Sequence, residues 1–106
     1  MIPRLSDQNI SDPILRASYY QMIREYIATH QSELIAYTVH EHDAYRYDLV
    51  SYRIYNTVAL DWLIALVADR TDMIESLPVG QIIYLPKASY IRQSMRQFID
   101  EIVQHD

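Results

Sequence analysis

The sequence contains no cysteine, which excludes disulfide bonds and metal sites built on thiolates. It contains a single glycine, Gly80, which excludes the glycine-rich loops that hold phosphates and dinucleotides. The nine lysines and arginines are scattered singly through a chain of net charge -5, so no basic patch indicates binding to nucleic acid. The longest apolar run, 58–68, contains Asp61 and is too short to cross a membrane, and residues 1–4 lack the pattern of a secretory signal. We therefore expect a protein made in a cytoplasm, with neither nucleic acid nor a membrane as its partner.

Apolar residues and tyrosines are plentiful by contrast. Half of the 106 residues are hydrophobic, which is typical of one folded domain with a small core. Ten residues are tyrosines, which offer a large and partly polar contact area and are enriched at protein interfaces. Some tyrosines will fill the core with a solvated hydroxyl, but a core this small cannot take all ten. We expect the others to contact partner proteins.

A helix is predicted from residue 13 to about residue 30. Asp12 can accept hydrogen bonds from the first free amides, and Pro13 fits the first helical position. Apolar residues then recur at spacings of three and four, as expected for one buried helix face: Leu15, Tyr19, Met22, Ile23, Tyr26 and Ile27. Tyr20 lies off this stripe and is a candidate partner contact. Residues 1–10 show no periodicity and are interpreted as an arm.

The middle of the chain predicts the order strand, helix, helix, strand. Residues 34–39 and 81–85 are rich in strand-forming side chains, and Pro86 ends the second stretch. Between them, Asp48 can cap a first helix, and Asn56 tolerates the left-handed conformation that a reversal after a helix often needs.

The two predicted middle helices differ in their apolar patterns. We expect the first to bury Leu49, Tyr52 and Tyr55 on one face. The second, 60–68, is apolar nearly all round, which indicates a buried helix with Trp62 as its largest contribution to the core.

The final stretch, 88–104, is the most periodic segment of the chain. Six apolar side chains fall on one stripe of the predicted helix: Ile91, Met95, Phe98, Ile99, Ile102 and Val103. The gain from burying them is comparable to the entropy lost on ordering the helix, so the helix should persist only if the stripe is covered. The first predicted helix or a neighbouring subunit can cover it, and we prefer the subunit because a small core offers little area. With Tyr20 and Tyr90, these six residues form the predicted partner interface.

Candidate chemistry is sparse in this sequence. His40 and His42 are two residues apart at the expected end of a strand, where they would face the same way, and acidic residues lie beside them. Such an arrangement can hold a metal ion, but a solvated turn or a partner contact is the interpretation we prefer. The carboxylate pairs lack a companion nucleophile, and no serine lies in an elbow motif. We therefore expect neither catalysis nor a cofactor or metal.

Four short segments in the middle of the chain carry a resemblance to a known family. They are YTVHEHD (37–43), DLVSYRIY (48–55), LDWLIA (60–65) and LPVGQIIYLP (77–86). These segments resemble the LysM-like domains of phage tail proteins. Two flanking segments, DPILR (12–16) and KASYIRQSM (87–95), are similar to the ends of the small baseplate wedge protein of contractile-tailed bacteriophages.

The resemblance implies an α+β fold with a LysM-like βααβ core at 34–86 and amphipathic helices at both ends. It divides the chain into an N-terminal arm and helix (1–33), the LysM-like domain, and a C-terminal amphipathic helix (87–106). It implies a virion structural protein of the tail baseplate, assembled in the host cytoplasm. Several copies around the tail axis would join neighbouring wedge, sheath-initiator or hub and tube proteins through their terminal helices.

The alternative is a peptidoglycan-binding LysM module. The family often has glycine where His42 and Asn56 stand, and asparagine where Asp69 stands. The change at His42 alters the loop that borders a glycan groove in peptidoglycan-binding modules. The resemblance therefore favours the baseplate role over sugar binding.

Overall fold

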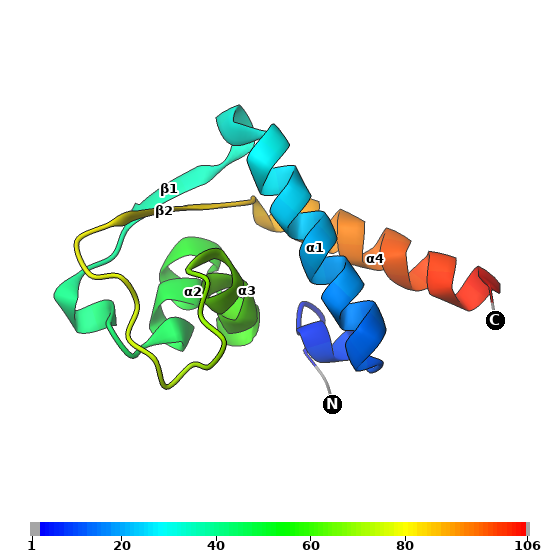
Figure 1. Cartoon of the computed structure of the whole chain (residues 1–106), viewed down its shortest axis with the longest axis horizontal. Coiled ribbons are helices and arrows are strands. Elements are labelled where there is room, and N and C mark those ends of the chain that lie inside the picture. The colour runs from blue at the N-terminus through cyan, green and yellow to red at the C-terminus, as the bar shows by residue number, and fades with distance from the viewer. Residues whose placement is uncertain (1–2, 106) are drawn as a thin grey trace.

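The fold is arranged around a short helix, α3 (Asp61–Val67), whose side chains are buried on nearly every side. The computed structural model describes residues 3–105, with side chains described for residues 3–102 (Figure 1). Besides α3, these residues form helices α1 (Pro13–Thr29), α2 (Tyr47–Tyr55) and α4 (Ala88–His105) and strands β1 (Ile35–Thr38) and β2 (Ile82–Leu85). The α+β class predicted from the sequence is confirmed. Within the described residues, no helix is both long and apolar enough to cross a membrane.

Helix α1 begins and ends as its sequence predicts. The Asp12 carboxylate accepts hydrogen bonds from the amides of Ile14 (2.8 Å) and Leu15 (3.4 Å), and Pro13 opens the first turn. Tyr19 and Ile23 are fully buried on the predicted apolar face. The helix therefore presents its stripe to the interior of the same chain.

The two strands form an antiparallel pair in which Ile35 lies opposite Leu85 and Thr38 opposite Ile82. Because side chains alternate along a strand, Ile83 and Leu85 of β2 are buried, while Ile82 and Tyr84 face outward. Gly80, just before β2, has a φ of 85°, a left-handed conformation that glycine adopts without strain. Backbone hydrogen bonds between Val39 and residues 80–81 continue the pairing beyond the end of β1 and the start of β2.

Two hydrophobic cores meet at α3. The terminal-helix core combines residues of the N-terminal segment, α1, α3 and α4: Ile10, Tyr19, Ile23, Leu60, Trp62, Leu63, Leu66, Ile91 and Met95. The sheet core combines residues of α2, α3 and the strands with their flanks: Val39, Tyr47, Val50, Ile64, Ala65, Ala68, Leu77, Ile83 and Leu85. Figure 1 shows the corresponding layout, with α1 and α4 crossing beside α2 and α3 and the strand pair running above α2 and α3. Helix α3 is apolar nearly all round because it serves both cores.

Helix α2 differs from its prediction at its first turn. It begins at Tyr47, Arg46 occupies the cap position, and Asp48 lies inside the helix, where its carboxylate pairs with Arg46 at 3.1 Å. Since the helix starts earlier, its buried face falls on Tyr47, Val50 and Ser51, at the spacing of one helical turn. The expectation that Asp48 caps the helix and that Tyr52 is buried is therefore wrong, and Tyr52 is exposed. Asn56 follows the helix at a φ of 58°, as its left-handed preference predicts.

The N-terminal segment is not a free arm in the described part, residues 3–10. It contains a 3-10 turn (Asp7–Asn9) and ends in the buried Ile10. The indole Nε1 of Trp62 donates a hydrogen bond to the Leu5 carbonyl at 3.0 Å, which ties the segment to α3. Its lack of periodicity reflects an irregular backbone and says nothing of whether it packs on the core.

Candidate functional site

Two of the predicted contact side chains, Ile91 and Met95, lie in the chain's own core. They are 0% and 3% exposed and pack with Tyr19 and Ile23 of α1. The Tyr19 hydroxyl adds a polar link, since it lies 2.9 Å from the Ser94 hydroxyl, and burial raises its pKa to about 12. The preference for a neighbouring subunit as the cover of α4 is corrected for these two residues, because α1 already supplies the cover.

The rest of the predicted stripe is covered less completely. Phe98 and Ile99 are half-buried against the terminal-helix core, and Ile102 is also half-buried. The side chain of Val103 lies outside the described residues. The distal half of α4 therefore keeps apolar surface that a partner can contact, whereas Ile91 and Met95 in its first half offer none.

The two predicted contact tyrosines both have partners within the chain. Tyr20 donates a hydrogen bond to the Asp7 carboxylate and stacks on Trp62 with ring centroids 5.8 Å apart. Tyr90 stacks on Tyr26 at a centroid distance of 3.6 Å. Both are half-buried, so a partner could contact only the exposed edge of each ring.

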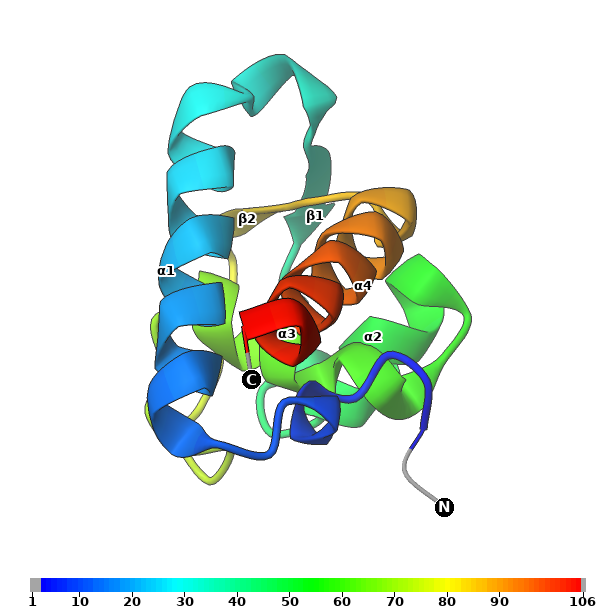
Figure 2. The same ribbon diagram turned by 90° about the vertical axis from the view of Figure 1, so that its right-hand side faces the viewer.

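A groove of about 950 Å³, which we call the α4 groove, is lined by residues of the N-terminal segment and of α4. Figure 2 shows both of these segments on the side of the molecule that faces the viewer. The apolar lining of the groove comes from Leu5, Met95 and Ile99. Its charged lining comprises Arg4, Arg92, Arg96, Asp100 and Glu101. Within residues 3–102, none of the three arginines forms an ion pair or a side-chain hydrogen bond.

Two further surfaces expose large apolar side chains away from this groove. One is the outer face of the strand pair, which we call the sheet outer face and which consists of Ala36, Thr38, Ile82 and Tyr84. The other is the loop after α3, in which Met73 and Ile74 are exposed. Exposed apolar side chains that gather on one surface are typical of sites that bind another protein.

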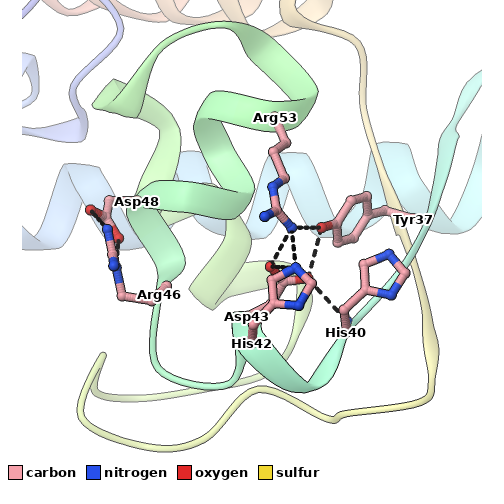
Figure 3. Close-up of polar contacts among 7 residues, drawn as sticks. All are labelled: Tyr37, His40, His42, Asp43, Arg46, Asp48 and Arg53. Carbon is pink, nitrogen blue, oxygen red and sulfur yellow. Dashed lines mark hydrogen bonds and ion pairs between the residues drawn. The ribbon is translucent and has the colours of Figure 1, made fainter.

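A polar cluster around one buried carboxylate lies between β1 and α2, and Figure 3 shows it in detail. The Asp43 carboxylate is 0% exposed and accepts hydrogen bonds from the Tyr37 hydroxyl (2.7 Å), the His40 amide (2.9 Å) and Arg53 Nη1 (2.9 Å). His42 Nε2 lies 2.7 Å from the same Arg53 nitrogen. The cluster fastens the end of β1 and the 3-10 turn (Glu41–Asp43) to α2.

The geometry of this cluster is that of a structural link. The donors around Asp43 point at its carboxylate, and His42 Nε2 faces Arg53. The two imidazoles therefore do not face a common point at which a metal ion could bind. His40 and His42 instead stack, with ring centroids 5.5 Å apart. Among the described residues, no group of three or more histidines and carboxylates could hold a metal ion.

Sequence reasoning missed both the Asp43 cluster and the α4 groove. Asp43 stands three residues after His40, the spacing of a capping box, and the structure shows both hydrogen bonds of that motif. That spacing could have revealed the cluster. The groove joins residues 4–9 to residues 89–101, and no local pattern in the sequence connects these two segments.

Comparison with known proteins adds no relative. No family model, curated protein or solved structure matches the chain.

Proposed function

We propose that the chain is a structural subunit of a contractile-tail baseplate, where it joins neighbouring wedge, sheath-initiator or hub and tube proteins. The resemblance of segments 37–86 to LysM-like domains of phage tail proteins is the starting point. In that family the core follows the order strand, helix, helix, strand, with antiparallel strands. Here β1, α2, α3 and β2 follow in that order, and β1 pairs antiparallel with β2. This agreement supports a LysM-like core.

The exposed outer face of the sheet is the main observation in favour of a role in binding other proteins. Ile82 and Tyr84 remain 52% and 51% exposed, although the inner side chains of the same strand already complete the sheet core. Within the described residues the sheet has only two strands, so each strand also has one edge without a strand partner. Apolar side chains beside open strand edges favour the docking of another protein.

The mechanism that follows is mechanical. Because α3 belongs to both cores, the sheet outer face and the distal half of α4 are parts of one packed body. Protein interiors are close-packed and transmit strain. A partner bound at the sheet and another bound along α4 would therefore be held at a fixed distance and orientation, as a joint in an assembly requires.

The experiment is co-purification with sheath-initiator, wedge and hub proteins of a contractile tail, each expressed together with the chain. We expect the wild-type chain to retain at least one of them. The double substitution Ile82→Thr and Tyr84→Thr should abolish this retention while leaving the circular dichroism spectrum unchanged, since threonine also favours strands.

The matched control is the double substitution Ile14→Thr and Val58→Thr, which removes two apolar side chains outside the sheet that are at least as exposed as Ile82 and Tyr84. It should leave retention intact. Equal loss in both variants would show that general surface hydrophobicity, and not the sheet outer face, holds the partner. Failure of the wild-type chain to retain any tail protein, together with its retention on isolated peptidoglycan, would overturn the baseplate proposal in favour of a glycan-binding module.

A further inference from the structure

The loop after α3 carries an apolar tip between acidic side chains. Asp69, Asp72 and Glu75 are exposed, and between them Ile74 is 79% exposed, with Met73 beside it. We call residues 69–75 the acidic loop. Its one basic residue, Arg70, is folded back: its guanidinium donates to the carbonyls of residues 76 and 68 at 2.8 and 3.1 Å. The loop therefore presents negative charge around an apolar side chain.

The acidic loop is held in a defined shape. One Glu75 carboxylate oxygen accepts from the amides of Thr71 and Asp72 (3.2 Å each), and Asp72 accepts from the amide of Ile74 (3.1 Å). The Tyr47 hydroxyl donates to the Glu75 carbonyl at 2.7 Å and joins the loop to α2. A surface segment ordered before binding loses less conformational entropy when it docks. The loop thus has the properties of a preformed knob.

The α4 groove has the complementary properties. Arg4, Arg92 and Arg96 line it without an ion-pair partner within residues 3–102, on a chain whose net charge is -5. Its apolar lining of Leu5, Met95 and Ile99 offers a surface for an apolar tip. Asp100 and Glu101 lie among the lining residues as well, so the three arginines outnumber two carboxylates. The volume of about 950 Å³ is of the size that binding sites have.

We propose that the acidic loop of one copy of this chain docks in the α4 groove of a second copy, with Ile74 against the apolar lining and the loop carboxylates facing Arg92 and Arg96. The loop and the groove are different surfaces, since no residue of the acidic loop lines the groove. In Figure 1 the segment between α3 and β2 lies below and to the left of α3, whereas α4 extends to the right. Such a contact is head-to-tail and repeats from copy to copy, closing into a ring if the rotation allows. For its biological setting this inference rests on the proposed baseplate role, in which several copies surround one axis.

The test uses the isolated full-length chain as its own probe. Sedimentation velocity and amide chemical shifts are followed at low ionic strength over protein concentrations up to about 1 mM. We expect concentration-dependent association that weakens as salt is added, with shift changes at residues 69–75 and 92–99. The substitution pair Arg92→Glu and Arg96→Glu should weaken association at least tenfold, about the effect of placing like charges face to face. Ile74→Arg, at a side chain with almost no internal contacts, should do the same.

Mixing the two defective variants is the decisive experiment. The loop variant keeps a wild-type groove, which can accept the wild-type loop of the groove variant, so equimolar mixing should restore association in one-to-one pairs. The pair Arg46→Glu and Lys87→Glu, with the same change in net charge at two exposed sites outside the groove, should leave association unchanged. A chain that stays monomeric throughout, or association that survives the groove variant, would overturn the inference.

The outcome is separable from that of the proposed function. If copies do not associate while the sheet outer face still retains a tail protein, only the copy-to-copy contact fails. If copies associate through the groove while no tail protein is retained, the baseplate role fails and the self-association stands.

Discussion

At Asp43, a buried carboxylate is surrounded by donors from β1, the 3-10 turn and α2. Burial alone would raise the pKa of this carboxyl, but the hydrogen bonds from the His40 amide and the Tyr37 hydroxyl and the charge of Arg53 outweigh burial and hold the pKa below its usual range. A carboxyl with a lowered folded-state pKa stabilises the fold above its unfolded-state pKa. That stabilisation disappears as the pH falls through the folded-state pKa.

Replacing Asp43 with asparagine should therefore destabilise the chain at neutral pH. We expect the free energy of unfolding at pH 7 to fall by about 2 kcal/mol, since the buried donors lose a charged acceptor. Urea denaturation followed by circular dichroism measures this change. Asp48→Asn is the control, because the Asp48–Arg46 pair is exposed and should contribute much less. An equal loss in both variants would contradict the role assigned to burial.

The same variant should also lose part of the acid sensitivity of the fold. The difference in unfolding free energy between wild type and Asp43→Asn should stay constant near neutral pH and shrink as the pH is lowered from about 5 towards 2, where the wild-type carboxyl takes up its proton. Urea denaturation at a series of pH values tests the sign. A difference that grew on acidification would mean that the folded-state pKa of Asp43 is raised and not lowered.

At the scale of elements, the sequence predicted where helices and strands lie better than which surface each one meets. Caps, turn residues and periodicity are local, so the start of α1, the reversal at Asn56 and the limits of β2 were predictable. Periodicity also identified the apolar stripe of α4, but it does not say what covers a stripe. That information lies in α1, about seventy residues earlier, whose Tyr19 hydrogen-bonds to Ser94.

Removing α4 should consequently unfold the chain. Deletion of residues 87–106 exposes Tyr19 and Ile23 of α1 and leaves the terminal-helix core open. We expect the truncated chain to lose its cooperative thermal transition by circular dichroism. If a partner protein covered α4 instead, the truncated chain would stay folded and keep a sharp thermal transition.

Point substitutions along α4 should destabilise the fold more near the start of the helix than near its end. Ile91→Ala, at a fully buried position, should lower the free energy of unfolding by about 2 to 5 kcal/mol. Ile102→Ala, at a half-buried position nearer the end of the helix, should cost clearly less. Urea denaturation of the two variants compares them directly, and similar losses would indicate that the whole helix is covered equally.

For the whole molecule, the shared helix α3 predicts one folding unit. The terminal-helix core contains Leu63 and the sheet core contains Ile64, its neighbour on the same helix. Neither core can open without removing part of the cover of α3. The sequence predicted a buried α3 from its composition, but long-range packing decides that two cores, and not one, meet there.

A matched pair of substitutions tests whether the two cores unfold together. Ile23→Val in the terminal-helix core and Ile64→Val in the sheet core should each cost about 1 kcal/mol and lower the midpoint of thermal unfolding by about 4 to 8 °C. Circular dichroism in the far and near ultraviolet should show one coincident transition for both variants. Two separated transitions, each shifted by only one substitution, would show that the cores unfold independently.

Trp62 is the single tryptophan of the chain, and its indole stacks on the Tyr20 ring and donates a hydrogen bond to the carbonyl of Leu5. Its indole thus reports on a contact made by the first few described residues. Any event that lifts this segment off α3 would let water reach the indole and move its emission to longer wavelength. The molecule carries an intrinsic fluorescent probe that reports, without a label, whether its amino-terminal segment is packed on α3.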